Sequence, residues 1–173
     1  MSKVKTLPPR RKIKPADTWD LSSLFKDDAG WERTFKKWEK QIPGYEKFRG
    51  HLGDSAEMLA ACLQFDSAIE RAGENLGTYA YLKASEDQAN SDYQRMKGRY
   101  THAATKAGEA SSFIRPELMS IPAEKIKAFM EAREIEPWKL ALERILRLGD
   151  MKRSAIRPRK RCSRAGTAPR PRA

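Results

Sequence analysis

Apolar side chains recur at intervals of three and four residues through most of the segment 15–150, and they almost nowhere alternate with polar ones. Such intervals place side chains on one face of an α-helix, whereas alternation is typical of a β-strand. The first such face consists of Trp31, Phe35, Trp38 and Ile42. We therefore predict an all-α fold. Because no repeat of fixed period is present, antiparallel helical hairpins packed as a bundle are favoured over a solenoid.

Capping and helix-breaking residues set the boundaries of the first two predicted helices. Asp27 or Asp28 can cap the first helix, because a carboxylate accepts hydrogen bonds from free N–H groups of the first turn. This helix is expected to end before Pro43, since proline lacks the N–H that the helical ladder needs. Asp54, with Glu57 three residues later, resembles a capping box and predicts the start of a long second helix.

The predicted second and third helices both contain small residues. Gly73 and Gly77 are expected to interrupt the second helix slightly, without ending it. Asn90 or Ser91 is expected to cap the third, in which residues 103–112 carry a stripe of alanine, glycine and serine. Small side chains allow a neighbouring helix to approach closely, so we interpret the stripe as packing within the domain. The alternative interpretation is a groove for another molecule.

The formal net charge of +12 is concentrated at the two ends of the chain of 173 residues. Residues 1–14 hold six basic side chains and residues 151–173 hold nine, with no acidic residue in either segment. The segment between them has the remaining 20 basic residues and all 23 acidic ones, a net charge of −3. A nucleic-acid-binding domain needs a basic surface on its folded part. The distribution therefore argues against nucleic acid as a partner.

Composition divides the chain into three predicted parts. Residues 1–14 are a basic N-terminal tail, residues 15–149 are the helical domain, and residues 150–173 are a basic tail that we expect to be disordered. The last 23 residues contain seven arginines and three prolines, with Ile156 as their only large aliphatic side chain. A segment of this composition cannot bury enough apolar surface to fold.

Targeting and membrane signals are missing from the sequence. No apolar run approaches the length of about 20 residues that a transmembrane helix requires, and the basic N-terminus is not followed by the apolar stretch of a signal peptide. Cys62 and Cys162 lie too far apart to suggest a small secreted domain held by disulfides. We therefore expect a cytoplasmic protein without a membrane partner.

The histidines and cysteines do not form a recognisable catalytic or metal-binding pattern. His51 and His102 each lack a second histidine or a cysteine at ligand spacing, and the zinc motif His-Glu-x-x-His is absent. Cys62 falls on the inward face of its predicted helix and is interpreted as a small core residue, whereas Cys162 falls in the C-terminal tail. A nucleophilic pair of Cys62 with a distant histidine is the less favoured alternative.

Three carboxylates share one face of the predicted second helix. Asp66, Glu70 and Glu74 follow one another at intervals of four residues and could in principle chelate a cation. Helical carboxylate sites for two metal ions also need Glu-x-x-His motifs, and none is present. We therefore favour a solvated face whose acids pair with the nearby Arg71 and Lys83.

Nucleotide-binding motifs are also missing, since the sequence contains neither a Walker loop nor a dinucleotide fingerprint. Arg115 follows the expected end of the third helix, where a cation interacts favourably with the last carbonyl groups. It is therefore interpreted as a helix cap and not as an anion receptor. No catalytic, cofactor-binding or metal-binding residue is predicted in this chain.

Several stretches spread over residues 7–148 occur together in an order that matches a known family. They are LPPR at 7–10, DTWDLSSLFKDD at 17–28, YEKFRGHLGDSAEMLAACLQFD at 45–66, LGTYAYLKASEDQANSDYQRMKGRY at 76–100, SSFIRPELMSIP at 111–122 and PWKLALERILR at 137–147. Together they resemble the N-terminal portion of the oligoendopeptidase F family, zinc metallopeptidases of the thimet-like group. None of these stretches is a catalytic motif.

The resemblance implies the helical N-terminal lobe of a larger metallopeptidase that hydrolyses oligopeptides. In that family this lobe walls a deep channel that admits short peptides, and the zinc-binding helix lies far downstream. No zinc ligand or catalytic residue can be carried onto a position of this chain, so zinc is expected only in the full-length family. The resemblance ends near Leu148, and we interpret the arginine- and proline-rich tail as an out-of-frame or misassigned end, with a natural basic tail as the alternative.

Three functions are therefore considered for the chain. The favoured one is a fragment of an oligopeptide-cleaving zinc endopeptidase that is inactive alone and meets oligopeptide substrates only as part of the full-length enzyme. The second is a non-catalytic helical module that binds a peptide or a protein partner. The third, ranked last, is a nucleic-acid binder that acts through its basic tails. The oligomeric state is not predicted.

Overall fold

The computed structural model describes residues 10–156, and within this range it contains helices and no strand. The α-helices of this range are α1 (Asp28–Gln41), α2 (Ala56–Glu86), α3 (Ser91–Ser111), α4 (Ile114–Ser120), α5 (Ala123–Met130) and α6 (Lys139–Ile156). The 3-10 helices are η1 (Arg10–Lys12), η2 (Pro15–Asp17), η3 (Ile42–Lys47) and η4 (Arg133–Trp138). The predicted all-α fold is confirmed. Among the helices of the described range, none combines the length and the apolarity that crossing a membrane requires.

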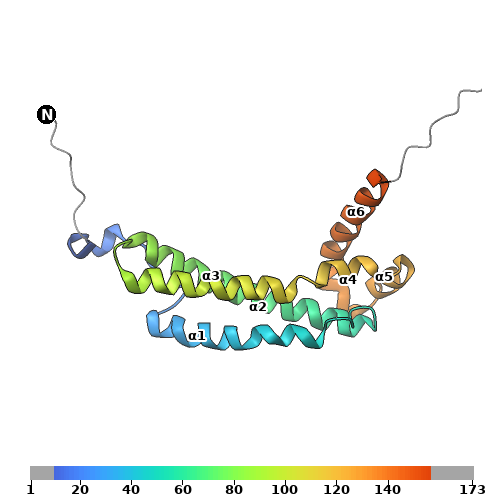
Figure 1. Ribbon diagram of the computed structural model, residues 1–173, viewed down its shortest axis with the longest axis horizontal. Helices are drawn as coiled ribbons and strands as arrows, with labels where there is room; N and C mark the ends of the chain where they lie inside the picture. The colour runs from blue at the N-terminus through green and yellow to red at the C-terminus, as the bar shows by residue number, and fades with distance from the viewer. Residues whose placement is uncertain (1–9, 157–173) are drawn as a thin grey trace, which may run out of the picture.

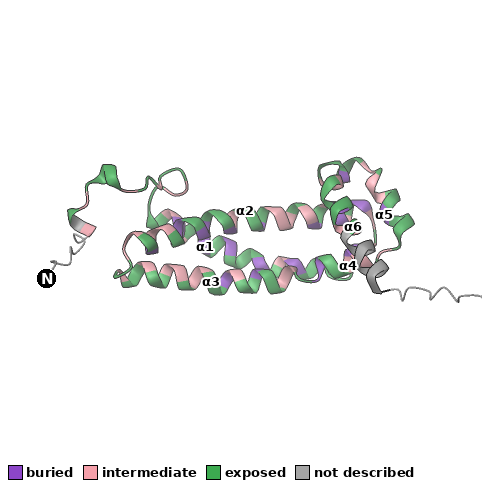
Figure 2. Ribbon diagram, turned by 90° about the horizontal axis from the view of Figure 1, so that it is seen from above, coloured by how far each residue is buried: buried purple, intermediate pink, exposed green. Residues whose placement is uncertain are grey.

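Three long helices form the body of the molecule, and the shorter helices gather at one of its ends. Helices α1, α2 and α3 run along the longest axis, while α4, α5 and α6 gather at the end of the body where α2 begins and α3 ends (Figure 1). Helices α2 and α3 form an antiparallel hairpin whose turn is closed by Asn90. The Oδ1 atom of Asn90 accepts hydrogen bonds from the N–H groups of Asp92 and Tyr93. Buried residues face the space between the three long helices (Figure 2).

Helix α1 is joined to α2 by aromatic side chains that both pack and donate hydrogen bonds. Trp31, Phe35 and Trp38 are at most 3% exposed, as their spacing predicts. The Nε1–H group of Trp31 donates to the backbone oxygen of Leu76, and that of Trp38 donates to the backbone oxygen of Ile69, each over 2.9 Å. A buried indole N–H needs such a partner, so both tryptophans are held in fixed positions against α2.

Helix α1 is joined to α3 by an ion pair with two hydrogen bonds. The guanidinium of Arg99 donates to both carboxylate oxygens of Glu32, over 2.7 and 3.0 Å. These hydrogen bonds lower the pKa of Glu32 and raise that of Arg99. The Arg99 guanidinium also lies 4.7 Å from the ring centre of Phe35. The pair therefore connects α1 to α3, so each of the three long helices contacts the other two.

The start of α2 differs from the predicted capping box. The N-cap residue is Ser55, whose hydroxyl oxygen accepts the N–H of Met58 over 3.2 Å. The carboxylate of Asp54, which was expected to be the cap, lies 2.8 Å from Nδ1 of His51. The cap is therefore one residue later than predicted.

The two glycines of α2 mark close helix contacts and do not interrupt the helix, which is continuous over Ala56–Glu86. A Cβ atom on Gly73 would lie 3.1 Å from Cζ2 of Trp38, and one on Gly77 would lie 2.5 Å from Cζ of Tyr100. The predicted soft interruptions are therefore wrong. Both positions instead let an aromatic side chain of a neighbouring helix approach the α2 backbone.

Helix α4 begins directly after α3, and this changes the position of Arg115. The residue lies in the first turn of α4 and not beside the last carbonyl groups of α3, so its interpretation as a C-terminal cap is wrong. The following Pro116 explains the new helix, because proline is compatible with a first helical turn, where N–H groups have no intrahelical partner.

Glu117 of α4 binds the loop that precedes α2. Its carboxylate oxygens accept the N–H groups of Gly50 and Leu52 over 2.9 and 2.8 Å. Gly50 has a φ of 82°, a value that favours glycine, and Leu52 is fully buried. These two hydrogen bonds, which we call the Glu117 clasp, connect α4 to the loop that precedes α2.

Helix α6 extends to Ile156, past the boundary at residue 149 that composition suggests for the helical domain. The predictions for residues 157–173, including their disorder and their origin from an altered reading frame, lie outside the described residues. The same is true of residues 1–9 of the N-terminal tail. The three-part division of the chain stays a prediction.

We predict that Gly73→Ala lowers the free energy of unfolding by about 1–3 kcal/mol, because the new methyl group meets an indole that cannot move without losing its hydrogen bond. The matched control is Gly98→Ala in α3, where a Cβ atom meets nothing within 4 Å. This control should raise stability by up to about 1 kcal/mol, since alanine favours a helix. Urea unfolding followed by circular dichroism measures both. Equal stabilisation by the two variants would contradict the close contact.

Candidate binding groove

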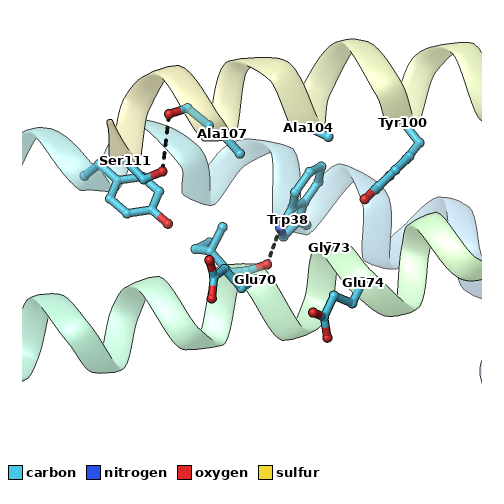
Figure 3. A pocket seen from close by; sticks show the side chains of 11 residues that line it. Trp38, Glu70, Gly73, Glu74, Tyr100, Ala104, Ala107 and Ser111 are labelled. Atoms are coloured by element: carbon cyan, nitrogen blue, oxygen red, sulfur yellow. Dashed lines mark hydrogen bonds between the residues drawn. The ribbon is translucent and has the colours of Figure 1, made fainter. Parts of the chain in front are cut away.

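A groove of about 300 Å³ lies between α2 and α3, above the end of α1 (Figure 3). Its floor comes from α1 and η3, and its walls come from α2 and α3. The lining residues are Trp38, Tyr45, Ile69, Glu70, Gly73, Glu74, Tyr100, Ala104, Ala107, Gly108 and Ser111. The groove therefore combines aromatic rings, two carboxylates and a row of small residues.

The floor of the groove is an aromatic surface. The rings of Trp38 and Tyr100 are stacked, with their centres 6.0 Å apart and their planes inclined by 21°. The indole N–H of Trp38 is already bonded to the backbone oxygen of Ile69. Trp38 is only 3% exposed, so its ring forms the base of the groove and offers little surface to a ligand.

The α3 wall corresponds to the stripe of small residues noted in the sequence. Ala103 and Ala107 are buried in the core, as the prediction of packing within the domain requires. Ala104, Gly108 and Ser111 line the groove together with Ala107, and a Cβ atom on Gly108 would meet nothing within 4 Å. Both interpretations of the stripe therefore hold in part. One edge of it packs within the domain, and the other edge borders the open space of the groove.

The groove continues along the two helices into a second hollow of about 520 Å³. Its lining residues are Glu74, Gly77, Thr78, Tyr81 and Tyr100. Glu74 and Tyr100 belong to both hollows, so the two form one elongated depression. The ring of Tyr81, which is 42% exposed, meets Tyr100 edge to face at 6.2 Å.

The α2 wall carries the three carboxylates that the sequence places on one helix face. Asp66 accepts a hydrogen bond of 2.6 Å from the hydroxyl of Tyr45, and burial together with this contact raises the pKa of Tyr45 above its ordinary value. Partial desolvation, followed by the nearby charges of Asp66 and Glu74, raises the pKa of Glu70. The wall is therefore a region of negative potential.

The predicted partners of these carboxylates are not found. Lys83 lies 3.7 Å from the carboxylate of Asp28 on α1, and Arg71 makes no ion pair with another described residue. Within residues 10–147, no basic side chain lies within 4 Å of Glu70 or Glu74. The prediction of a face neutralised by Arg71 and Lys83 is therefore wrong, because α1 draws Lys83 away.

The described residues do not provide a site for zinc. No group of three or more histidine, cysteine, aspartate or glutamate side chains in this part of the chain is arranged to hold a metal ion. His51 is paired with Asp54, and His102 is an exposed residue of α3. The donor set that a catalytic zinc ion needs, three protein ligands around an open position, does not fit these side chains.

Comparisons with known proteins agree on one family, although no family model matches the chain. Oligopeptidase PepF of Bacillus subtilis (strain 168) is 34% identical over 145 residues, which are 83% of this chain and 22% of that protein. The chromosomal oligoendopeptidase F of Lactococcus lactis subsp. cremoris is 33% identical over 111 residues, which are 64% of this chain and 18% of that protein. The chain spans about a fifth of the length of these curated relatives.

Solved structures give the same result for the fold. A crystal structure described as a peptidase from Chlamydophila abortus has a TM-score of 0.76 and 25% identity, and the match covers 87% of this chain and 27% of that one. Oligoendopeptidase-F from Enterococcus faecium has a TM-score of 0.66 at 23% identity, covering 71% and 24%. In sequence and fold, the chain is similar to a part of proteins named oligopeptidase PepF and oligoendopeptidase F.

Cys62 provides a test of the core beneath the groove. It is a fully buried free thiol, and burial, followed by the charge of Asp66, raises its pKa to about 12. The reactive thiolate is therefore scarce at pH 8 and becomes abundant only as the pH approaches 12. In a Cys162→Ser background, we predict that Ellman's reagent labels Cys62 at least about 100-fold more slowly in the folded protein than in denaturant. Equal rates would contradict this environment.

Proposed function

We propose that this chain supplies the helical N-terminal region of an oligoendopeptidase that hydrolyses oligopeptides in the cytoplasm. The observation that carries the proposal is the 34% identity over 145 residues with Oligopeptidase PepF. The likeness of fold to a crystal structure described as a peptidase, at a TM-score of 0.76, supports it independently. Activity and substrates belong to the whole protein in this proposal.

Within such an enzyme, this chain has the part of a binding wall and not of a catalytic centre. Its sequence lacks His-Glu-x-x-His, and its described side chains offer no ligand set for zinc. Zinc, which makes bound water a nucleophile at neutral pH, would be held by other residues of a full-length protein. The residues of this chain contribute an aromatic and acidic groove of a size suited to a peptide segment.

A second candidate function is a non-catalytic helical module that binds a peptide or protein partner. The groove between α2 and α3 favours it, because this chain by itself forms the two adjoining hollows. A monodisperse monomer of the chain in gel filtration would support the module. Aggregation that is relieved only by a larger peptidase fragment would support the enzyme lobe.

We predict that the purified chain neither retains zinc nor cleaves peptides. Elemental analysis after dialysis should find well below one zinc ion per chain. Incubation with an internally quenched oligopeptide and added zinc should give no fluorescence above a protein-free control. One tightly held zinc ion together with cleavage that 1,10-phenanthroline abolishes would overturn the proposed division of roles.

A further inference from the structure

Residues 10–20, which comprise η1, η2 and the three residues after them, form a segment that we call the N-terminal strap. We propose that this strap opens and closes as a unit on the folded body, and that the carboxylate of Glu86 is the latch that holds it closed. Glu86 is the last residue of α2, and the strap lies beside the turn that joins α2 to α3 (Figure 1). Such a movement needs only this chain and is independent of the proposed function.

One carboxylate binds both ends of the strap. One oxygen of Glu86 lies 2.8 Å from Nη2 of Arg10, and the other accepts the backbone N–H of Trp19 over 3.2 Å. The Glu86 side chain is only 10% exposed, whereas that of Glu32, in its ion pair with Arg99, is 33% exposed. A hydrogen bond to a charged group is stronger where water has little access to it. Glu86 is therefore a strong single point of attachment for the strap.

The position of Glu86 at the C-terminal end of α2 adds to the attraction for Arg10. The last carbonyl groups of a helix carry partial negative charge, which favours a nearby cation and disfavours a carboxylate. With the strap closed, the guanidinium of Arg10 compensates the carboxylate and the helix end together. The latch therefore depends on charge, and a neutral side chain at position 86 should weaken it.

The remainder of the strap is attached weakly. Among the described residues, its other hydrogen bonds are local and join positions three residues apart. No side chain whose burial is described in residues 10–20 is buried, and Leu21 is the first described residue that packs against the core. Segments with few buried apolar contacts and local hydrogen bonds open at a low free-energy cost. The strap can therefore leave the body up to a hinge near Leu21.

A hollow of about 250 Å³ lies where the strap meets the end of α2. Its lining residues are Arg10, Asp17, Thr18, Trp19 and Glu86. The side chain of Trp19 is 53% exposed and does not fill this space. Protein interiors leave few voids larger than a water molecule. The strap thus touches the body at the latch and borders open space beside it, which is the packing of a movable segment and not of a core element.

Amide hydrogen exchange followed by NMR on the full 173-residue chain tests the latch. Glu86→Ala removes both contacts, so the amide of Trp19 should exchange at least about tenfold faster than in the unaltered chain. Glu86→Gln keeps an acceptor for this amide but loses the charge that binds Arg10, so it should give a smaller increase. The amides of the buried residues Leu76 and Ala103 should exchange at unchanged rates in both variants.

Two further variants separate the latch from general effects of charge. Glu109→Ala is the matched control, because Glu109 is an exposed residue near the C-terminal end of α3, far along that helix from the turn beside the strap. It should leave exchange at Trp19 unchanged. Arg10→Gln removes only the ionic contact of the latch and should reproduce the result of Glu86→Gln.

Each outcome decides a separate point. Unchanged exchange at Trp19 in Glu86→Ala would overturn the latch. Equal acceleration at Trp19, Leu76 and Ala103 would show that the strap opens only when the body unfolds, and would overturn its separate movement. Exchange at Trp19 in the unaltered chain that is already as fast as in an unstructured peptide would overturn the closed state. Acceleration at Trp19 by Glu109→Ala would overturn the assignment of the latch to Glu86.

Discussion

Two indole N–H groups of α1 donate to backbone oxygens inside α2, and the arrangement of the helical body depends on this pair of hydrogen bonds. The tryptophans are seven residues apart, and so are their acceptors Leu76 and Ile69, which corresponds to two helical turns on each side. A carbonyl oxygen has two lone pairs, so it can accept an indole N–H in addition to its own helical bond. Together the two bonds fix the register between α1 and α2.

The groove is a consequence of that register. Because Trp38 is held against α2 at Gly73, its ring lies at the base of the groove between α2 and α3. Tyr100 of α3 reaches the backbone of α2 at Gly77, and this contact keeps the walls together at one point. The absence of side-chain bulk at Gly108 keeps them open at another. Aromatic side chains on α1 and α3 and glycines on α2 and α3 together determine the shape of the groove.

The features that local spacing determines could be predicted from the sequence, and those that depend on distant contacts could not. Trp31, Phe35 and Trp38 were assigned to a buried face, because periodicity alone places them there. The pairing of Lys83 with Asp28 depends on a helix distant in sequence. The small residues of α3 were evident as a stripe, but no local pattern says that Gly108 faces open space. The resemblance to oligoendopeptidase F was visible, because it rests on ordered sequence across several helices.

The Glu117 clasp joins a loop near the start of the domain to a residue that the ribosome adds much later. The carboxylate lies 67 and 65 residues after the two N–H groups that it binds. A ribosome that has completed α1 and α2 has therefore not yet made the acceptor for these two N–H groups, of which one is exposed and one is partly buried. The hydrogen bonds from this loop to Glu117 can form only after α4 has emerged. Order at Gly50 and Leu52 would thus report, on the nascent chain, how far translation has proceeded.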